Sequence, residues 1–446
     1  MKRLGPFSFL RSTRPARLSR DFGRKPGFWL HTELRTALVF LVVLLAVAAP
    51  LVVVGQTKVS PLLGISATDV FFDDTVVQDV RLDLNAIDWQ TLKANFREDT
   101  YYPADFRWRD QVVRGAGIRS RGLGTRSPVK PGLRVDFNRF VDGQEFLGLK
   151  SVVLKNNVTD ASNMRERISM LLFRRLGFPA SREVTARLFV NNEFAGVYTM
   201  VESVDKAFLK RLFSENDGYL FSYEWAGPYY FTDRGTDPRN YVPSPFQPET
   251  HEDDPKPEAL VDLVQAINHS ADFARDMPTY LDLKKFVRQI AVETCLADHD
   301  DFLGDFGMAN FFLYRPPDTK QFVMLPWDKS EAFTHPQFSI WQNIRFVPGE
   351  RANQLIGRAI GVPDLNTLYL DTLLECAAAM NEPGSGDARG WLEREIDREN
   401  AQIRDLAFAD PVKPFSNGDY DAEVFRLIDF ARRRGAFITQ EVGASR

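Results

Sequence analysis

The chain has 446 residues, of which 44% are hydrophobic and 26% are charged, so it is long and apolar enough to bury a sizeable core. Nine Lys and Arg oppose two acidic residues in residues 1–56, whereas 47 basic residues oppose 58 acidic residues in the remainder. This acidic body argues against nucleic acid as the main partner, because nucleic acids bind to basic surfaces.

An uncharged apolar run, TALVFLVVLLAVAAPLVVVG, occupies residues 36–55. About 20 helical residues cross a bilayer core of roughly 30 Å, so this run predicts a transmembrane helix rather than a buried core helix. The basic leader, residues 1–35, precedes it, and the positive-inside rule places that leader in the cytoplasm. The lipid bilayer is therefore an expected partner.

The residues after this run are then expected outside the cytoplasm, in the periplasm or at the cell surface. Residues 56–76 resemble a tether, and residues 77–446 form the body. A cleaved signal peptide is the alternative to an anchor, because Ala46 and Ala48 form an A-x-A pattern.

The first part of the body alternates between apolar and polar residues as strands do. A helix begins near Asp160 or Ser162 and is expected to run to Leu176. Strands are expected in residues 76–92 (leading into a helix), 101–122, 132–140 and 184–203, the last as a hairpin around Asn191 and Asn192.

The second part is mostly helical by pattern, after a loop rich in Pro, Asp and aromatic residues at 226–256. Helices are expected at 257–269 and 282–297, and from 352 to 441 with breaks at Pro363 and 381–387. A strand-rich part followed by a helix-rich part indicates an α+β fold.

Cysteine and histidine residues indicate no metal site. Cys295 and Cys376 each lie in an apolar helical pattern, where two buried thiols are expected and a disulfide is the alternative. The five histidines are scattered and no C-x-x-C pair occurs, so a zinc site is not expected.

One stretch, DFGMANFFLYRPPDTKQFVMLPWD at residues 305–328, carries a spacing typical of protein kinases. In kinases a helix leads to a catalytic loop with an Asp and, five residues later, an Asn; a hairpin then delivers a second Asp. The first Asp accepts the proton of the substrate hydroxyl, and the other two residues hold Mg²⁺. Asp305, Asn310 and Asp328 fit these roles in order, so the letters DFG mark the catalytic loop. The alternative is a chance spacing, with Asp328 ending a turn.

Five further segments extend the similarity: GIRSRGLGTRSPVKPGLRVDF, VTDASNMRERISMLLFRRLGFPAS, VNNEFAGVYTMVESVDKAFL, NFFLYRP and LPWD. In this order they resemble the CotH (spore coat protein H) kinase family of atypical secretory-type protein kinases. The resemblance covers about residues 77–335 and continues more weakly beyond them. It implies a kinase-like fold with an N-lobe at about 77–205 and a C-lobe at about 206–446.

The resemblance also implies nucleotide-binding residues. Arg121 and Gly122 match the family's R-x-R-G stretch. Lys130 matches a Lys before a strand, and Glu166 in the following helix is the expected partner of that Lys. The alternatives are a solvated lysine and a solvent-facing Glu.

Glu202 falls where a kinase hinge passes the adenine, although its role is equally compatible with structure alone. Two departures from the family pattern stand out. Ser330 replaces the second acid of W-D-x-D, which weakens a second metal site or leaves Glu331 to substitute. Leu303 and Gly304 stand where kinases have the His of H-R-D.

The resemblance and the spacing together imply a membrane-anchored, extracytoplasmic kinase that transfers a phosphoryl group from ATP, with Mg²⁺ or Mn²⁺, to Ser or Thr hydroxyls of a protein substrate. A catalytically inactive pseudokinase or cell-envelope scaffold is the alternative, because ATP is scarce outside the membrane. A transferase acting on a glycan or small molecule is a third reading.

Overall fold

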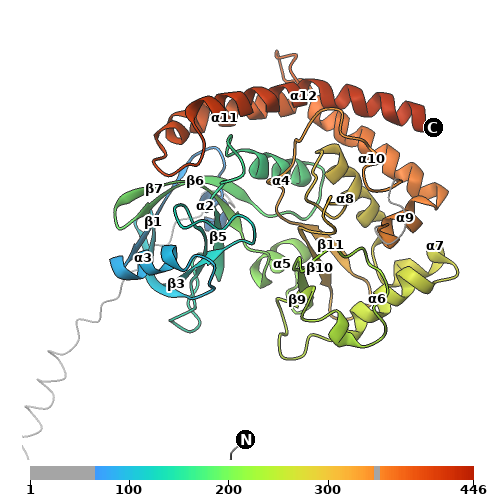
Figure 1. The fold of residues 1–446 in the computed structure, drawn as a ribbon, viewed down its shortest axis with the longest axis horizontal. Coiled ribbons are helices and arrows are strands. Elements are labelled where there is room, and N and C mark those ends of the chain that lie inside the picture. Colours follow the sequence, from blue (N-terminus) through green and yellow to red (C-terminus); the bar gives the residue numbers. More distant parts are fainter. Residues whose placement is uncertain (1–65, 346–351) are drawn as a thin grey trace, which may run out of the picture. The chain divides into compact units, whose positions relative to one another are not determined.

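Seven strands in the N-terminal half close into a barrel (Figure 1). The computed structural model describes residues 66–345 and 352–446. Neighbouring strands follow the order β1-β2-β3-β4-β5-β7-β6, and the barrel closes through the parallel pair β1 and β6. The strands are β1 (Gln78–Leu84), β2 (Tyr102–Trp108), β3 (Gln111–Arg121), β4 (Gly132–Asp136), β5 (Ser151–Lys155), β6 (Glu183–Val190) and β7 (Glu193–Glu202).

The barrel is filled by aromatic side chains that pack edge to face. Phe71, at the end of α2 (Ala67–Phe71), contacts Phe106, Trp108 and Phe146 with ring centroids 5.1–6.3 Å apart. Each of these four side chains is at most 3% exposed. Burial of such large rings is the main stabilising contribution of this half of the molecule.

The predicted hairpin at 184–203 is confirmed as β6 and β7. Asn191 and Asn192 form its turn with φ values of 51° and 68°. Asn tolerates this left-handed conformation better than most residues, and a two-residue turn with positive φ matches the twist of the strands.

Helices surround a second sheet in the C-terminal half, with strand order β11-β10-β8-β9. The predicted α+β composition is confirmed, and so is the hairpin expected between Asn310 and Asp328. The strands are β8 (Tyr219–Tyr223), β9 (Phe246–Pro248), β10 (Phe311–Arg315) and β11 (Val323–Pro326). The helices after the barrel are α5 (Lys206–Phe213), α6 (Glu258–His269), α7 (Phe273–Asp276), α8 (Leu283–Cys295), α9 (Gln354–Ile360), α10 (Pro363–Asn381), α11 (Trp391–Ala409) and α12 (Asn417–Ser445).

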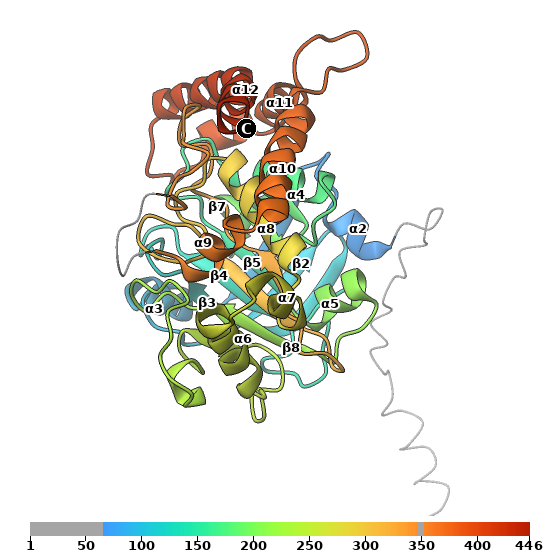
Figure 2. The same ribbon diagram turned by 90° about the vertical axis from the view of Figure 1, so that its right-hand side faces the viewer.

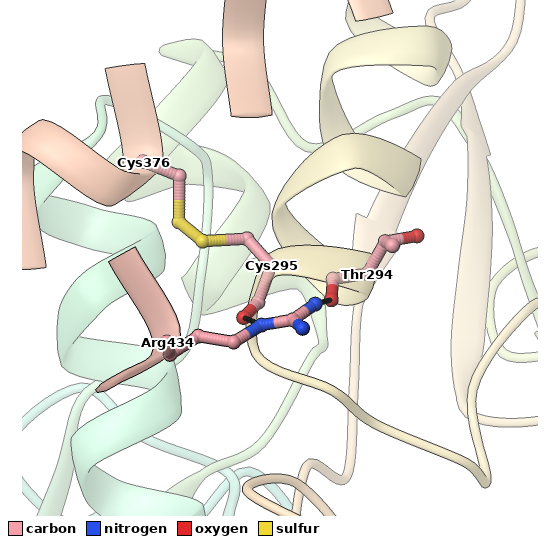
Figure 3. The surroundings of a disulfide bond; sticks show 4 residues. All are labelled: Thr294, Cys295, Cys376 and Arg434. Carbon is pink, nitrogen blue, oxygen red and sulfur yellow. Dashed lines mark hydrogen bonds between the residues drawn. A yellow bond between two sulfur atoms is a disulfide. The ribbon is translucent and has the colours of Figure 1, made fainter. Parts of the chain in front are cut away.

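Helix α8 contacts both strand β11 and helix α10, which lies beside it in Figure 2. Its last residue, Cys295, forms a disulfide with Cys376 of α10, so the expectation of two free thiols is wrong. The guanidinium of Arg434 donates hydrogen bonds to the carbonyl oxygens of Thr294 and Cys295, as Figure 3 shows. A covalent bond and a buried cation therefore fix the end of α8, from which the loop that contains the predicted catalytic residue leads to strand β10.

Two inserted helices complete the barrel half: α3 (Ala86–Ala94) follows β1, and α4 (Arg165–Arg175) connects β5 to β6. The C-terminal helices α11 and α12 pass over α4 (Figure 1). Buried ion pairs join them, since Arg167 on α4 contacts Glu399 of α11 and Arg165 contacts Glu423 of α12.

Among residues 66–345 and 352–446, no helix is both long and apolar enough to span a membrane. The predicted transmembrane helix at residues 36–55 lies outside the described residues, as do the predicted leader and most of the tether. The last barrel strand ends at Glu202, shortly before the lobe boundary expected near residue 205.

Candidate active site

A buried lysine between two acids marks the end of strand β5. The Nζ atom of Lys155 lies 2.7 Å from Oε1 of Glu166 and 2.7 Å from Oδ1 of Asp328. The Lys155 side chain is 10% exposed and that of Glu166 is 3% exposed. Burial lowers the pKa of Lys155, but the two carboxylates outweigh it and raise the pKa, so the ammonium stays charged.

Helix α4 positions Glu166 from its first turn. Asp160 precedes the helix, and its Oδ2 accepts a hydrogen bond of 2.9 Å from the backbone N–H of Arg165. The second carboxylate oxygen of Glu166 accepts a bond of 2.6 Å from the backbone N–H of Lys329. Glu166 therefore connects strand β5 to the segment that carries Asp328.

Asp328 follows strand β11 with φ of 45°. Such left-handed conformations of non-glycine residues are sparsely populated and concentrate at functional sites. Its Oδ1 also accepts a bond of 2.8 Å from the Ser330 hydroxyl, whereas no hydrogen bond from the described residues reaches Oδ2. Burial raises the pKa of Asp328, but Lys155 and Ser330 lower it further than burial raises it, so the carboxylate is ionised.

Trp327 presents its ring to two cations. The Lys155 ammonium lies 5.3 Å and the Arg121 guanidinium 5.1 Å from the ring centroid. Among the described residues, Arg121 has no hydrogen bond or ion pair, although Asp328 is one of the charges that act on its pKa. Its N–H donors are therefore free for an anionic ligand beside Asp328.

Asn310 precedes strand β10 with φ of 61°, and its carbonyl oxygen accepts a hydrogen bond of 3.1 Å from the backbone N–H of Trp327. Its Nδ2 donates to the carbonyl oxygen of Asp300 at 2.5 Å and to Oδ2 of Asp300 at 3.1 Å. The Oδ1 atom of Asn310 is thereby left as an acceptor. Burial, with repulsion from Asp298 and Asp328, raises the pKa of Asp300 to about 6.

Arg121, Asn310, Trp327 and Asp328 line a cleft of about 970 Å³, and Asp328 connects it to the Lys155–Glu166 pair. The apolar lining of the cleft includes Val153 of β5 and Phe312 of β10, which are 3% and 7% exposed and belong to one apolar cluster. The cationic residues that line it are Arg119, Arg121, Arg126, Arg134, Lys150 and Lys206, and the acidic ones are Asp99, Asp136, Asp205, Glu224, Glu249, Glu252, Asp253 and Asp328.

A sequence comparison then decides the family. The model of the family described as "CotH kinase protein" matches residues 118–438. The chain belongs to the CotH kinase family. The inner spore coat protein H of Bacillus subtilis (strain 168) is 22% identical over 359 residues, which cover 79% of this chain and 93% of that protein.

A comparison with solved structures adds the crystal structure of the Helicobacter pylori proinflammatory kinase CtkA. It covers 70% of this chain and 93% of the CtkA chain, with 8% identity and a TM-score of 0.28. At this score the likeness supports no conclusion about the fold or the site.

In this CotH family member, Lys155 and not Lys130 is the partner of Glu166. The Nζ atom of Lys130 lies 2.7 Å from Oδ2 of Asp410, and both side chains are 2% exposed. Neither lysine lines the cleft, but Lys155 contacts Asp328, which does. The predicted pairing of Lys130 with Glu166 is therefore wrong, because Asp410, distant in sequence, neutralises Lys130 elsewhere.

Asp305 is also placed away from Asn310. Its side chain is exposed, and Oδ1 accepts hydrogen bonds from Gln342 and Asn343 at 3.1 and 2.9 Å. The carboxylate that contacts Asn310 is that of Asp300. The five-residue kinase spacing predicted Asp305 at this position, whereas the structure places Asp300 beside Asn310.

The nearby Gly307 is explained by packing rather than by a kinase DFG motif. Gly307 has φ of 105°, and a Cβ atom there would meet Cα of Pro228 at 2.9 Å. Only glycine fits this conformation and this close approach.

Other predicted residues have mixed positions. Arg121 and Gly122 line the cleft, as do Asn310 and Asp328. Glu202 does not line the cleft. Its buried carboxylate instead forms ion pairs with Arg182 at 2.7 Å and Arg211 at 2.5 Å. The three residues that follow it, 203–205, line the cleft instead.

The residues fit one divalent cation bound between protein and phosphate. Asp328 Oδ2 and Asn310 Oδ1 are hard oxygen atoms, which Mg²⁺ and Mn²⁺ prefer. No group of three or more His, Cys, Asp or Glu in the described parts of the chain is arranged to hold a metal. Magnesium in kinases needs no such cage, because the nucleotide phosphates supply the other ligands. Glu331, considered as a substitute for the missing acid, does not line the cleft.

Two residues of this site escaped the sequence analysis. Lys155 ends an apolar strand, SVVLK, which parallels the V-A-I-K strand of kinases and was the available signal. Asp300 had no such signal, because several acids occupy the same loop and its distance from Asn310 differs from the kinase spacing.

Proposed function

We propose that this protein transfers the γ-phosphoryl group of ATP to Ser or Thr hydroxyls of a protein substrate. The observation that supports this best is the cluster of Lys155, Glu166 and Asp328, which meets the cleft at Asp328. Active protein kinases require the same set: a strand lysine paired with a helix glutamate, beside a metal-binding aspartate.

The nucleotide would lie along the cleft. Val153 and Phe312, which belong to one apolar cluster and line the cleft, would offer an apolar surface for the base. Lys155 and Arg121 offer ammonium and guanidinium donors to the phosphates. Asp328 and Asn310 would hold Mg²⁺ or Mn²⁺, which neutralises phosphate charge when bound.

Asp300 would accept the proton of the attacking hydroxyl. Its pKa of about 6 keeps it mostly ionised at neutral pH, and its bond to Asn310 fixes its orientation beside the metal ligand. Asp305, exposed and bonded to Gln342 and Asn343, is not assigned a chemical role.

A polypeptide acceptor is supported by an exposed aromatic pair beside the cleft. Trp225 and Phe306 are 42% and 67% exposed, and the indole N–H of Trp225 donates to the backbone oxygen of Phe306 at 3.0 Å. Phe306 belongs to the catalytic-loop stretch. The neighbouring cleft residues Glu224, Glu252 and Asp253 are exposed and form no ion pair within the described residues, which favours a segment with basic and apolar side chains.

The test is to incubate the purified 57–446 protein with γ-labelled ATP and Mg²⁺ or Mn²⁺, together with a pool of Ser- and Thr-containing polypeptides. We expect label on phosphoserine or phosphothreonine.

The Asp328→Asn variant should bind Mn²⁺ about 100-fold or more weakly than the wild type, since loss of an outer-shell partner alone typically costs 10–100-fold in metal affinity.

Two results of the labelling assay would contradict the proposal. Nucleotide binding without transfer would favour a pseudokinase or scaffold. Label on a glycan or small molecule, and none on polypeptide, would assign another acceptor class.

We also propose that residues 36–55 anchor the protein with residues 77–446 outside the cytoplasm. The apolar run and its basic flank support this topology. The Cys295–Cys376 disulfide is typical of an oxidising compartment. A protease added to spheroplasts is expected to digest the C-terminal body and spare the leader, and protection of the body would contradict this topology.

A further inference from the structure

The residue after Asp328 is a lysine with no solvent exposure. The Lys329 side chain is 0% exposed, and so is that of Glu293 on α8. The Nζ atom of Lys329 lies 3.2 Å from Oε1 of Glu293 and 3.7 Å from Oδ2 of Asp298. A buried ammonium is retained only where acids and acceptors compensate for lost hydration.

Lys329 also contacts the catalytic-loop stretch directly. Its Nζ donates to the backbone oxygen of Asn310 at 3.5 Å, and the same oxygen accepts from the backbone N–H of Trp327 at 3.1 Å. Asp298 continues the connection, because its Oδ1 accepts from the backbone N–H of Asp300 at 3.0 Å. The ammonium therefore touches Asn310 and reaches Asp300 through one residue.

The main chain of Lys329 extends the connection to helix α4, through its N–H bond of 2.6 Å to Glu166. One residue thus joins the parts of the candidate active site: Glu166 by its backbone, Asn310 and Asp298 by its side chain, and Asp328 by the peptide bond. None of these contacts places Lys329 in the cleft.

We propose that Lys329 is a positioning residue, whose buried ammonium sets Asn310 and Asp300 relative to Asp328. This role rests on the proposed phosphoryl transfer and extends it to a residue outside the cleft.

The alternative role is charge compensation alone, and a charge-balanced variant separates the two. Lys329→Met leaves Glu293 and Asp298 buried without a cation, so its melting temperature should fall by on the order of 10 °C. Lys329→Met with Glu293→Gln removes one charge of each sign. The glutamine keeps an oxygen for the Gln289 amide, which donates to Glu293 at 3.1 Å. We expect this double variant to regain the melting temperature within a few degrees.

Activity should not return with the fold. In the double variant, phosphoryl transfer should be about 10–100-fold slower than in the wild type, the range typical of lost outer-shell contacts. Mn²⁺ affinity in the presence of a non-hydrolysable ATP analogue, measured by electron paramagnetic resonance, should fall by a similar factor. Lys130→Met with Asp410→Asn is the matched control, because it removes another fully buried Lys–acid pair away from the cleft; both readouts should stay within a few-fold of wild type.

A double variant with wild-type transfer and wild-type Mn²⁺ affinity would reduce Lys329 to charge compensation and overturn the proposal. If the double variant does not fold, the fallback is Lys329→Gln in the Glu293→Gln background, which retains a side-chain donor. This variant should transfer phosphoryl groups faster than any folded Met variant but more slowly than the wild type. A transfer rate equal to that of the wild type would overturn the proposal. A wild-type protein that binds Mn²⁺ and nucleotide but transfers nothing contradicts the proposed function instead, while the Mn²⁺ measurement still decides the role of Lys329.

Discussion

Asp300→Asn is expected to slow phosphoryl transfer by about 10²–10⁴-fold, the usual contribution of a general base, while nucleotide affinity stays within a few-fold. The asparagine keeps an oxygen for the Asn310 amide, so the loop should hold its conformation. Only the proton acceptor is removed. Single-turnover transfer and calorimetric titration with ATP measure the two effects separately.

The same substitution should change the pH dependence. Burial raises the pKa of Asp300 to about 6. The protonated acid cannot accept a proton, so transfer by the wild type should fall as the pH drops below about 6 and level off above it. The residual activity of Asp300→Asn should lack this step.

Asp305→Asn is the matched comparison, because it changes another acid of the same loop whose side chain bonds to Gln342 and Asn343. Transfer should stay within a few-fold of wild type. If Asp305→Asn abolishes transfer and Asp300→Asn does not, the five-residue kinase spacing is the better guide and the base assigned from the structure is wrong.

The pattern of the sequence predicts much of the fold, since its signals are local. The Asn191-Asn192 turn fixes a hairpin within a few residues, and apolar periodicity marks α6, α8 and the hairpin β10–β11. Asn310 and Asp328 line one cleft because that hairpin brings its two ends together, a geometry that follows from antiparallel pairing.

What the sequence does not predict depends on contacts between distant residues. Lys130 precedes a strand and Lys155 ends one, and the fold alone pairs the first with Asp410 and the second with Glu166 and Asp328. The choice between Asp300 and Asp305 depends on how one loop packs against Pro228, Tyr229, Gln342 and Asn343. The sequence likewise does not predict the Cys295–Cys376 disulfide, because that bond depends on the packing of two helices whose cysteines are 81 residues apart.

Lys155→Met should reduce transfer by about 10³-fold, at the upper end of what loss of a single charge-stabilising donor costs. The phosphates lose an ammonium donor. Glu166, 3% exposed, also loses the cation that compensates its burial, and breaking a buried pair from one side costs about 3–5 kcal/mol. Because Glu166 also binds the backbone N–H of Lys329, its displacement should shift the segment that carries Asp328.

Two comparisons separate this effect from general destabilisation. Lys155→Arg keeps the charge and should restore the melting temperature more than the transfer rate, because a planar guanidinium cannot place one donor between Glu166 and Asp328 as an ammonium does. Lys130→Met with Asp410→Asn removes the lysine that the sequence had favoured. If this second variant loses nucleotide binding while Lys155→Met binds and transfers normally, the phosphate-binding lysine is Lys130 and the cleft is assigned to the wrong ligand. The opposite result is expected, since Lys155 alone of the two contacts Asp328, and Asp328 lines the cleft together with Asn310.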